Sequence, residues 1–179
     1  MSEYQYYGFC RVYSPLSAEV RREMKSLSSR AAVGTHTASY VYNFGDFRGR
    51  PLELLLKYFD MFLYLSNFGT VRLIFKYLRK DVDLPEIENH CVEDLIDCDE
   101  DGPFVWLDVR LDEKCFNPSD GDEVLPELLP IYEAIRRGSY QFLKLVKLLH
   151  EDKIKEIKEL SLSSAEKAFL ACCSDGCFS

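Results

Sequence analysis

Cysteine and histidine are the residue types in this chain that most directly supply a nucleophile, a general base or a metal ligand, and the sequence holds seven cysteines and three histidines. A cysteine nucleophile requires an imidazole next to it in space. His90 and Cys91 are neighbours in the sequence, but adjacent side chains of a strand point to opposite faces of the sheet. The spacing therefore disfavours thiol catalysis, and the odd, scattered set of cysteines does not indicate a disulfide framework.

The C-terminal cysteines form a thiol cluster in the sequence. Cys172 or Cys173, together with Cys177 and His150, could supply the donors of a zinc site. Zinc sites usually draw on two ligand pairs at spacings such as C-x-x-C, and neighbouring cysteines on a helix point about 100 degrees apart. We therefore expect no metal and no cofactor, with this set of residues as the weaker alternative.

The common catalytic and ligand-binding motifs are absent from the sequence. There is no G-x-x-x-x-G-K-[ST] loop, no G-x-G-x-x-G after a strand, no G-x-S-x-G elbow and no H-E-x-x-H. The acidic run DCDEDG (97–102) resembles a calcium loop, but its twelfth position is Asp108 where the EF-hand has a glutamate. We expect a protein that is not an enzyme.

Charge is distributed very unevenly along the chain, whose formal net charge is −8. Residues 1–80 hold 12 basic and 6 acidic residues, whereas residues 81–123 hold 2 basic and 16 acidic ones. Such a density of carboxylates cannot be buried without compensating charges, so the acidic segment lies in solvent or faces a basic partner. The sequence thus predicts either a solvated acidic loop or a docking surface.

The function class that remains is binding to another protein through a charged surface. We expect a non-catalytic interaction module, an adaptor or regulatory subunit, with no contact to a membrane. The alternative is a nucleic-acid-associated protein that uses a basic N-terminal sheet face, although the net negative charge opposes attraction to phosphates. Aromatic residues such as Tyr4, Tyr6 and Trp106 are expected to be exposed. The candidate partner-binding residues are Asp97, Asp99, Glu100, Asp101, Trp106, Arg48, Arg50 and Arg72.

Residues 1–123 read as a sheet with two helices. Strands are expected at 4–13 and 37–44, and helices at 17–28, capped by Ser17, and from Pro51 to about residue 59. Alternating apolar residues predict a hairpin of residues 61–66 and 71–78. A second hairpin is expected from residues 90–97 and 104–111, with the acidic run as its turn.

Residues 124–179 read as helices only, after a polar loop at 112–123. Helices are expected at 124–138, at 140–150 with Ser139 as cap, at 152–160, and from the capping box at Ser163 and Glu166 towards Cys172. The fold class is therefore α+β: an antiparallel sheet of about six strands with two helices, followed by an all-helical C-terminal layer. The sheet domain (1–123) and the helical region (124–179) are expected to pack as one unit. With no long apolar run and no signal peptide, a cytoplasmic location is expected.

Several short steps in the first half of the chain occur in a recognisable combination: YQYYGF (4–9), YNFGDF (42–47), RPL (50–52), YFD (58–60), FLY (62–64) and NFGT (67–70). Together they resemble an uncharacterised bacterial protein family, with the likeness dense over residues 4–78. The resemblance implies the fold and transfers no catalytic residue. It also suggests a place in a bacterial multi-component system, including antiviral defence and CRISPR-associated systems.

Overall fold

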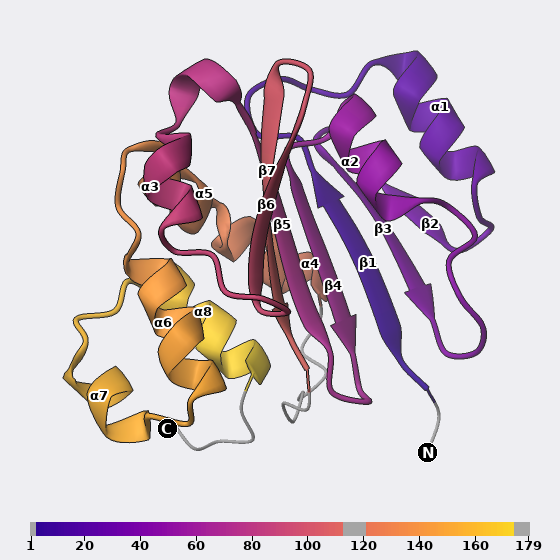
Figure 1. The fold of residues 1–179 in the computed structure, drawn as a ribbon. Helices are drawn as coiled ribbons and strands as arrows, with labels where there is room; N and C mark the ends of the chain where they lie inside the picture. The colour runs from indigo at the N-terminus through magenta and orange to yellow at the C-terminus, as the bar shows by residue number, and fades with distance from the viewer. Residues whose placement is uncertain (1–2, 113–120, 174–179) are drawn as a thin grey trace.

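The computed structural model describes residues 3–112 and 121–173 (Figure 1). Its centre is one antiparallel sheet of seven strands in the order β2-β3-β1-β4-β5-β7-β6. This confirms the α+β class; the additional strand is β2, a three-residue edge strand that the sequence did not predict. The strands are β1 (Gln5–Cys10), β2 (Ala31–Val33), β3 (Thr37–Tyr42), β4 (Met61–Ser66), β5 (Val71–Leu78), β6 (Ile96–Asp101) and β7 (Phe104–Leu111).

The helices begin where the sequence carries capping signals. Ser17 accepts a hydrogen bond from the Val20 amide, Pro51 occupies the first turn of its helix, and Ser163 and Glu166 each accept from the other's backbone amide. These three predicted starts are confirmed. The helices are α1 (Ala18–Ser26), α2 (Pro51–Tyr58), α3 (Leu84–Glu88), α4 (Gly121–Glu127), α5 (Leu129–Arg136), α6 (Gln141–His150), α7 (Ile154–Glu159) and α8 (Ser164–Cys173), with a 3-10 turn at Arg79–Asp81.

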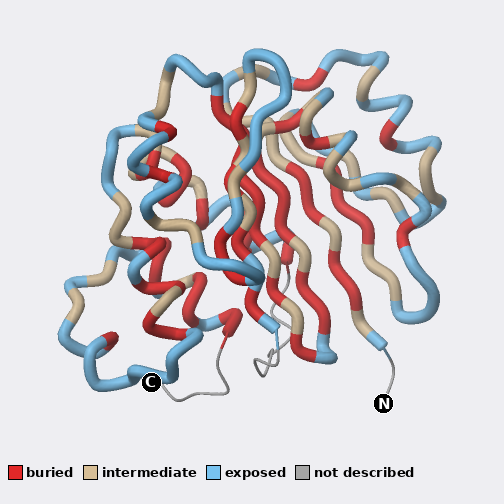
Figure 2. The backbone as a smooth tube through the Cα atoms, viewed as in Figure 1, coloured by how far each residue is buried: buried red, intermediate tan, exposed pale blue. Residues whose placement is uncertain are grey.

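The two faces of the sheet are covered by different helices. On the first face, strand residues such as Phe9 and Phe62 pack with Met24 of α1 and Leu55 of α2. On the second face, the other set of alternating residues packs with the C-terminal helices. Figure 2 shows buried residues concentrated along the central strands and exposed residues along the acidic strand β6.

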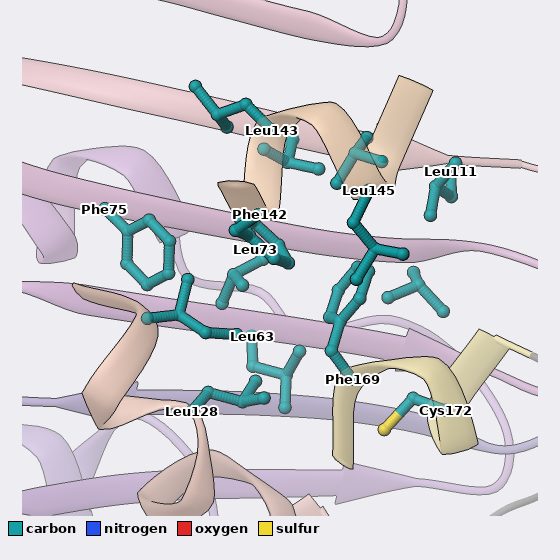
Figure 3. Packing of buried hydrophobic residues seen from close by; sticks show 14 of the residues in the cluster. Leu63, Leu73, Phe75, Leu111, Leu128, Phe142, Leu143, Leu145, Phe169 and Cys172 are labelled. Atoms are coloured by element: carbon teal, nitrogen blue, oxygen red, sulfur yellow. The ribbon is translucent and has the colours of Figure 1, made fainter. Parts of the chain in front are cut away.

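The second-face core joins the sheet to the C-terminal layer. Phe75 of β5 packs edge-on to Phe142 of α6, and Phe142 in turn packs edge-on to Phe169 of α8 (Figure 3). All three rings are at most 2% exposed. One buried cluster thus contains residues from both ranges that the sequence analysis distinguished, 1–123 and 124–179.

The first strand is covered by a helix from far along the chain. Tyr6 is fully buried, and its hydroxyl donates to Asp122 Oδ1 over 2.9 Å. A Cβ atom at Gly121 would lie 2.5 Å from the Tyr6 ring, so only glycine allows α4 to approach this closely. The expectation that Tyr6 is exposed was wrong, because α4 covers the Tyr6 side chain.

Gln5 connects three of the short sequence steps in the first half of the chain, YQYY, GDF and FLY. Its side-chain oxygen accepts from the hydroxyls of Tyr7 and Tyr64, and its amide nitrogen donates to the Gly45 carbonyl and to Asp46. Gln5 is only 4% exposed, and these bonds use both ends of its amide. The YQYY, GDF and FLY steps therefore meet around one satisfied polar group.

Three local predictions differ from the structure. The strand expected at 90–97 is instead β6 at Ile96–Asp101, so the acidic run lies on the strand and the turn consists of Gly102 and Pro103 alone. Residues 84–88 form the unpredicted α3. The helix expected at 124–138 is divided into α4 and α5, since Pro130 has no amide hydrogen to donate to the carbonyl four residues earlier. Ser139 does not cap α6, which begins after Tyr140. Of the loop expected at 112–123, residues 113–120 lie outside the described part.

In the described ranges, 3–112 and 121–173, every helix is too short or too polar to cross a lipid bilayer.

Candidate functional site

The structure brings five of the eight predicted partner-binding residues to one part of the sheet. Asp97, Asp99 and Asp101 alternate on β6 and share the first face with Trp106 of β7 and Arg72 of β5. Asp99 lies directly opposite Trp106 in the register. Helices α1 and α2 lie over the other strands of this face (Figure 1), whereas Asp97, Asp99 and Asp101 are exposed and Trp106 and Arg72 are half-buried.

The remaining three predicted residues lie apart from this surface. Glu100 points to the opposite face of β6 and pairs with Arg79, with 2.7 Å between Nε and Oε1. Arg48 and Arg50 are exposed in the segment that precedes α2, where Arg50 pairs with Glu53. The basic and acidic candidate residues therefore do not lie in two separate regions of the surface, one positive and one negative.

Arg72 is held by an acidic neighbour on its own sheet face. Its Nε atom donates to both oxygens of Asp108, and Nη2 donates to one of them. These hydrogen bonds are the main reason that the pKa of Arg72 is raised above its usual value. Asp97 is directly opposite Asp108, and two facing carboxylates would repel each other, so the guanidinium also removes this conflict. A groove of about 520 Å³ runs along these side chains.

The edge of β6 has an unusual hydrogen-bonding character. The two-residue turn requires Asp101 and Phe104 to exchange backbone hydrogen bonds, so Asp99 pairs in the same way with Trp106. The amides of Cys98 and Glu100 therefore point away from β7, towards the free edge. Each is capped by the carboxylate of the preceding residue: Cys98 N donates to Asp97 Oδ1 over 2.9 Å and Glu100 N donates to Asp99 Oδ1 over 2.8 Å.

Strand β6 consequently offers acceptors at its edge while its outward donors are already used. Ile96, at its start, exchanges both backbone hydrogen bonds with Val92. What remains is a row of backbone carbonyls and carboxylates. The sequence shows the acidic residues but not that they lie on an edge strand. The alternating apolar residues Val105, Leu107 and Val109 predict a strand that needs a partner beside it, and this was the available signal for β6.

The thiol cluster does not form a metal site within the described residues. Cys172 and Cys173 are buried in the second-face core on α8, whereas His150 is exposed at the end of α6. Cys177 lies outside the described part of the chain. Across residues 3–112 and 121–173, no three His, Cys, Asp or Glu side chains are grouped so that they could hold a metal ion.

Removing metal ions should leave the stability of the protein unchanged. A structural zinc contributes directly to folding, so a zinc-dependent protein unfolds when the metal is chelated. We expect the same thermal midpoint with and without a strong chelator, measured by circular dichroism on freshly purified protein. A lowered midpoint together with zinc detected in the untreated sample would contradict this and return attention to Cys172, Cys173, Cys177 and His150.

Comparison with known proteins assigns neither a family nor a function to this chain. No family model, no curated protein and no solved structure matches this chain. Function is therefore inferred from the surfaces of the chain itself.

Proposed function

We propose that this protein is a non-catalytic interaction module, an adaptor or regulatory subunit, that binds a lysine- or arginine-rich segment of a partner protein along β6. The observation that carries the proposal is the acceptor-only edge of this strand. Four of its six residues are acidic, and its two outward amides in the acidic stretch are capped by aspartates.

This edge discriminates between two ways of binding a peptide. A partner strand that added itself to the sheet would need amide donors from β6 for its own carbonyls, and those donors are occupied. Lysine and arginine side chains carry only donors, so they fit a surface of carbonyls and carboxylates. The same arrangement protects the isolated protein from edge-to-edge association with other copies.

Trp106 supplies the apolar element of the same surface. It is half-buried at the margin of the first-face core and lies opposite Asp99. A guanidinium that binds Asp99 would therefore find an indole beside it, and arginine stacks favourably on tryptophan. Charge and a flat aromatic surface together favour arginine-containing partners over lysine alone.

Neutralising β6 tests the proposal. In a variant with Asp97→Asn, Asp99→Asn, Glu100→Gln and Asp101→Asn, the free energy of unfolding should change by less than about 1 kcal/mol, because exposed charges contribute little. Association with the purified partner should become about tenfold slower at low salt and lose most of its salt dependence, since such charges act through the encounter rate. This rate is measured by stopped-flow fluorescence of Trp106, which is the only tryptophan and lies in the proposed binding surface.

The control variant makes the same change in net charge elsewhere. It carries Glu→Gln substitutions at four exposed positions away from β6, namely Glu19, Glu53, Glu156 and Glu159. This variant should associate at the wild-type rate. Equal rates for the β6 variant and the wild type at low and raised salt would contradict the proposal.

The nucleic-acid alternative has a separate test. Arg72 is already paired with Asp108, and Arg50 with Glu53, so phosphate binding would compete with existing ion pairs. A gel shift with single-stranded RNA that weakens with salt and is lost in an Arg48→Gln, Arg50→Gln variant would favour this alternative over partner binding.

A further inference from the structure

A cleft of about 660 Å³ opens where the ends of β1 and β5 meet α2 and α5. Its volume lies in the range of pockets that hold small molecules. Lys76 of β5 and Asp60 lie in it, Arg11 and Tyr13 come from the segment after β1, and Phe104 begins β7. The cleft shares no residue with the groove beside Arg72 and Asp108.

Lys76 is a buried cation in this cleft. It is 7% exposed, and its ammonium donates to the carbonyls of Leu55 and Leu56 at the end of α2, each over 3.2 Å. The nearest oxygen of Asp60 is 3.7 Å away, too far for a direct hydrogen bond. Burial lowers the pKa of Lys76, Asp60 partly offsets this, and Arg11 lowers it further.

Arg11 is a second cation in the lining of this cleft. Its half-buried guanidinium lines the cleft and has no hydrogen bond or ion pair with any residue of the described part of the chain. Arg11 and Lys76 line the same cleft, and the positive charge of Arg11 is one of the causes that lower the pKa of Lys76. Asp60 partly offsets the charge of Lys76, and its other oxygen already accepts from the Val12 amide over 2.8 Å. A guanidinium that has no partner among the described residues, in the same cleft as a buried ammonium, is suited to binding an anion.

Aromatic rings form the walls around these cations. Tyr13 is 60% exposed, and the Arg136 guanidinium lies 5.3 Å from its ring centroid. Phe104 lies 4.8 Å from the Lys76 ammonium, and Tyr58 and Tyr132 complete the lining. Flat apolar walls next to two cations select a ligand that combines a planar ring with a negative group.

We propose that this cleft binds a small organic anion with a planar ring, whose anionic group lies between Arg11 and Lys76. The anionic group is a carboxylate or a phosphate monoester, both of which a guanidinium binds with two parallel hydrogen bonds. The ring lies against Phe104 and Tyr13. This site is independent of the partner-binding surface on β6.

Four probe ligands separate the parts of the proposal, with binding measured by isothermal titration calorimetry. Benzoate and phenyl phosphate carry the ring with either anion, cyclohexanecarboxylate carries the anion without a planar ring, and inorganic phosphate has no ring. We expect benzoate or phenyl phosphate to bind, and the better of them shows which anion is preferred. Cyclohexanecarboxylate and inorganic phosphate should each bind several-fold more weakly than their ring-bearing counterparts, because the stacking contribution is lost.

The variant Arg11→Gln should weaken binding of the preferred probe at least about tenfold, since a hydrogen bond between charged groups is removed. It should unfold at the wild-type temperature, because the Arg11 side chain has no partner within the described residues. Arg48→Gln, which removes an exposed arginine elsewhere, should bind as the wild type does. Phe104→Leu should reduce the preference for the planar ring.

No binding of any probe at millimolar concentration, or equal binding by Arg11→Gln and wild type, would overturn the proposal, and equal affinity for inorganic phosphate and phenyl phosphate would overturn its ring component.

Discussion

Replacing Phe142 with alanine should lower the free energy of unfolding by about 3–5 kcal/mol. The ring lies between Phe75 of the sheet and Phe169 of α8, with centroids 6.3 Å and 4.8 Å away, and is 2% exposed. Its loss leaves a cavity where three elements meet, and the sheet on one side and α8 on the other limit how far the site can collapse (Figure 3). Urea denaturation followed by circular dichroism measures the change.

Phe68→Ala is the matched control for this substitution. Phe68 is 58% exposed in the turn between β4 and β5, so its removal should change the stability by no more than about 0.5 kcal/mol. If residues 124–179 pack with residues 1–123 as one cooperative unit, Phe142→Ala shifts a single transition. A separate early transition in this variant would contradict folding as one cooperative unit, and a loss below about 1 kcal/mol would contradict the burial of Phe142 between β5 and α8.

Glu166→Ala should lower the free energy of unfolding by about 2–3 kcal/mol, the second-largest effect expected. Glu166 is only 5% exposed and accepts hydrogen bonds from the Ser163 amide, the Ser163 hydroxyl and the Gln141 side chain. Alanine would remove the acceptor of the Ser163 amide and half of the capping box that begins α8, and Gln141 would keep only its hydrogen bond to the Ser161 carbonyl. Thermal and urea unfolding of the purified variant measure the loss.

Glu156→Ala controls for the loss of an acidic side chain from a short helix. Glu156 is exposed on α7, so this change should stay within about 0.5 kcal/mol. A Glu166→Ala variant as stable as Glu156→Ala would mean that the buried carboxylate is not a significant anchor between α6 and α8.

Features with a local physical cause were predictable from the sequence. The starts of α1, α2 and α8 follow from Ser17, Pro51 and Ser163, and the β4–β5 hairpin follows from apolar residues at every second position. The division of α4 from α5 was also encoded locally, by Pro130, but the apolar pattern that continues through it concealed the break.

Features that depend on distant residues were not predictable. Aspartate and glutamate are rare in strands, so the run 97–101 resembled a turn; only its pairing with β7 at the sheet edge makes a strand of it. The Arg72–Asp108 pair joins residues from two strands whose register no local signal defines. The same holds for Lys76, whose place in the alternating pattern of β5 gave no indication that α2 would bury it.

The cover of Tyr6 by α4 sets an order of events during synthesis. Strand β1 leaves the ribosome early, but Gly121 and Asp122, which pack on Tyr6, follow more than a hundred residues later. At ordinary translation speeds this delay is on the order of 10 s. During that time the second face of β1 and β4 has no helix to cover it, so the nascent chain exposes an apolar strand surface. The protein is thus expected to depend on chaperones more while it is being made than its size would suggest, and to gain its full structure only once the helical layer has emerged.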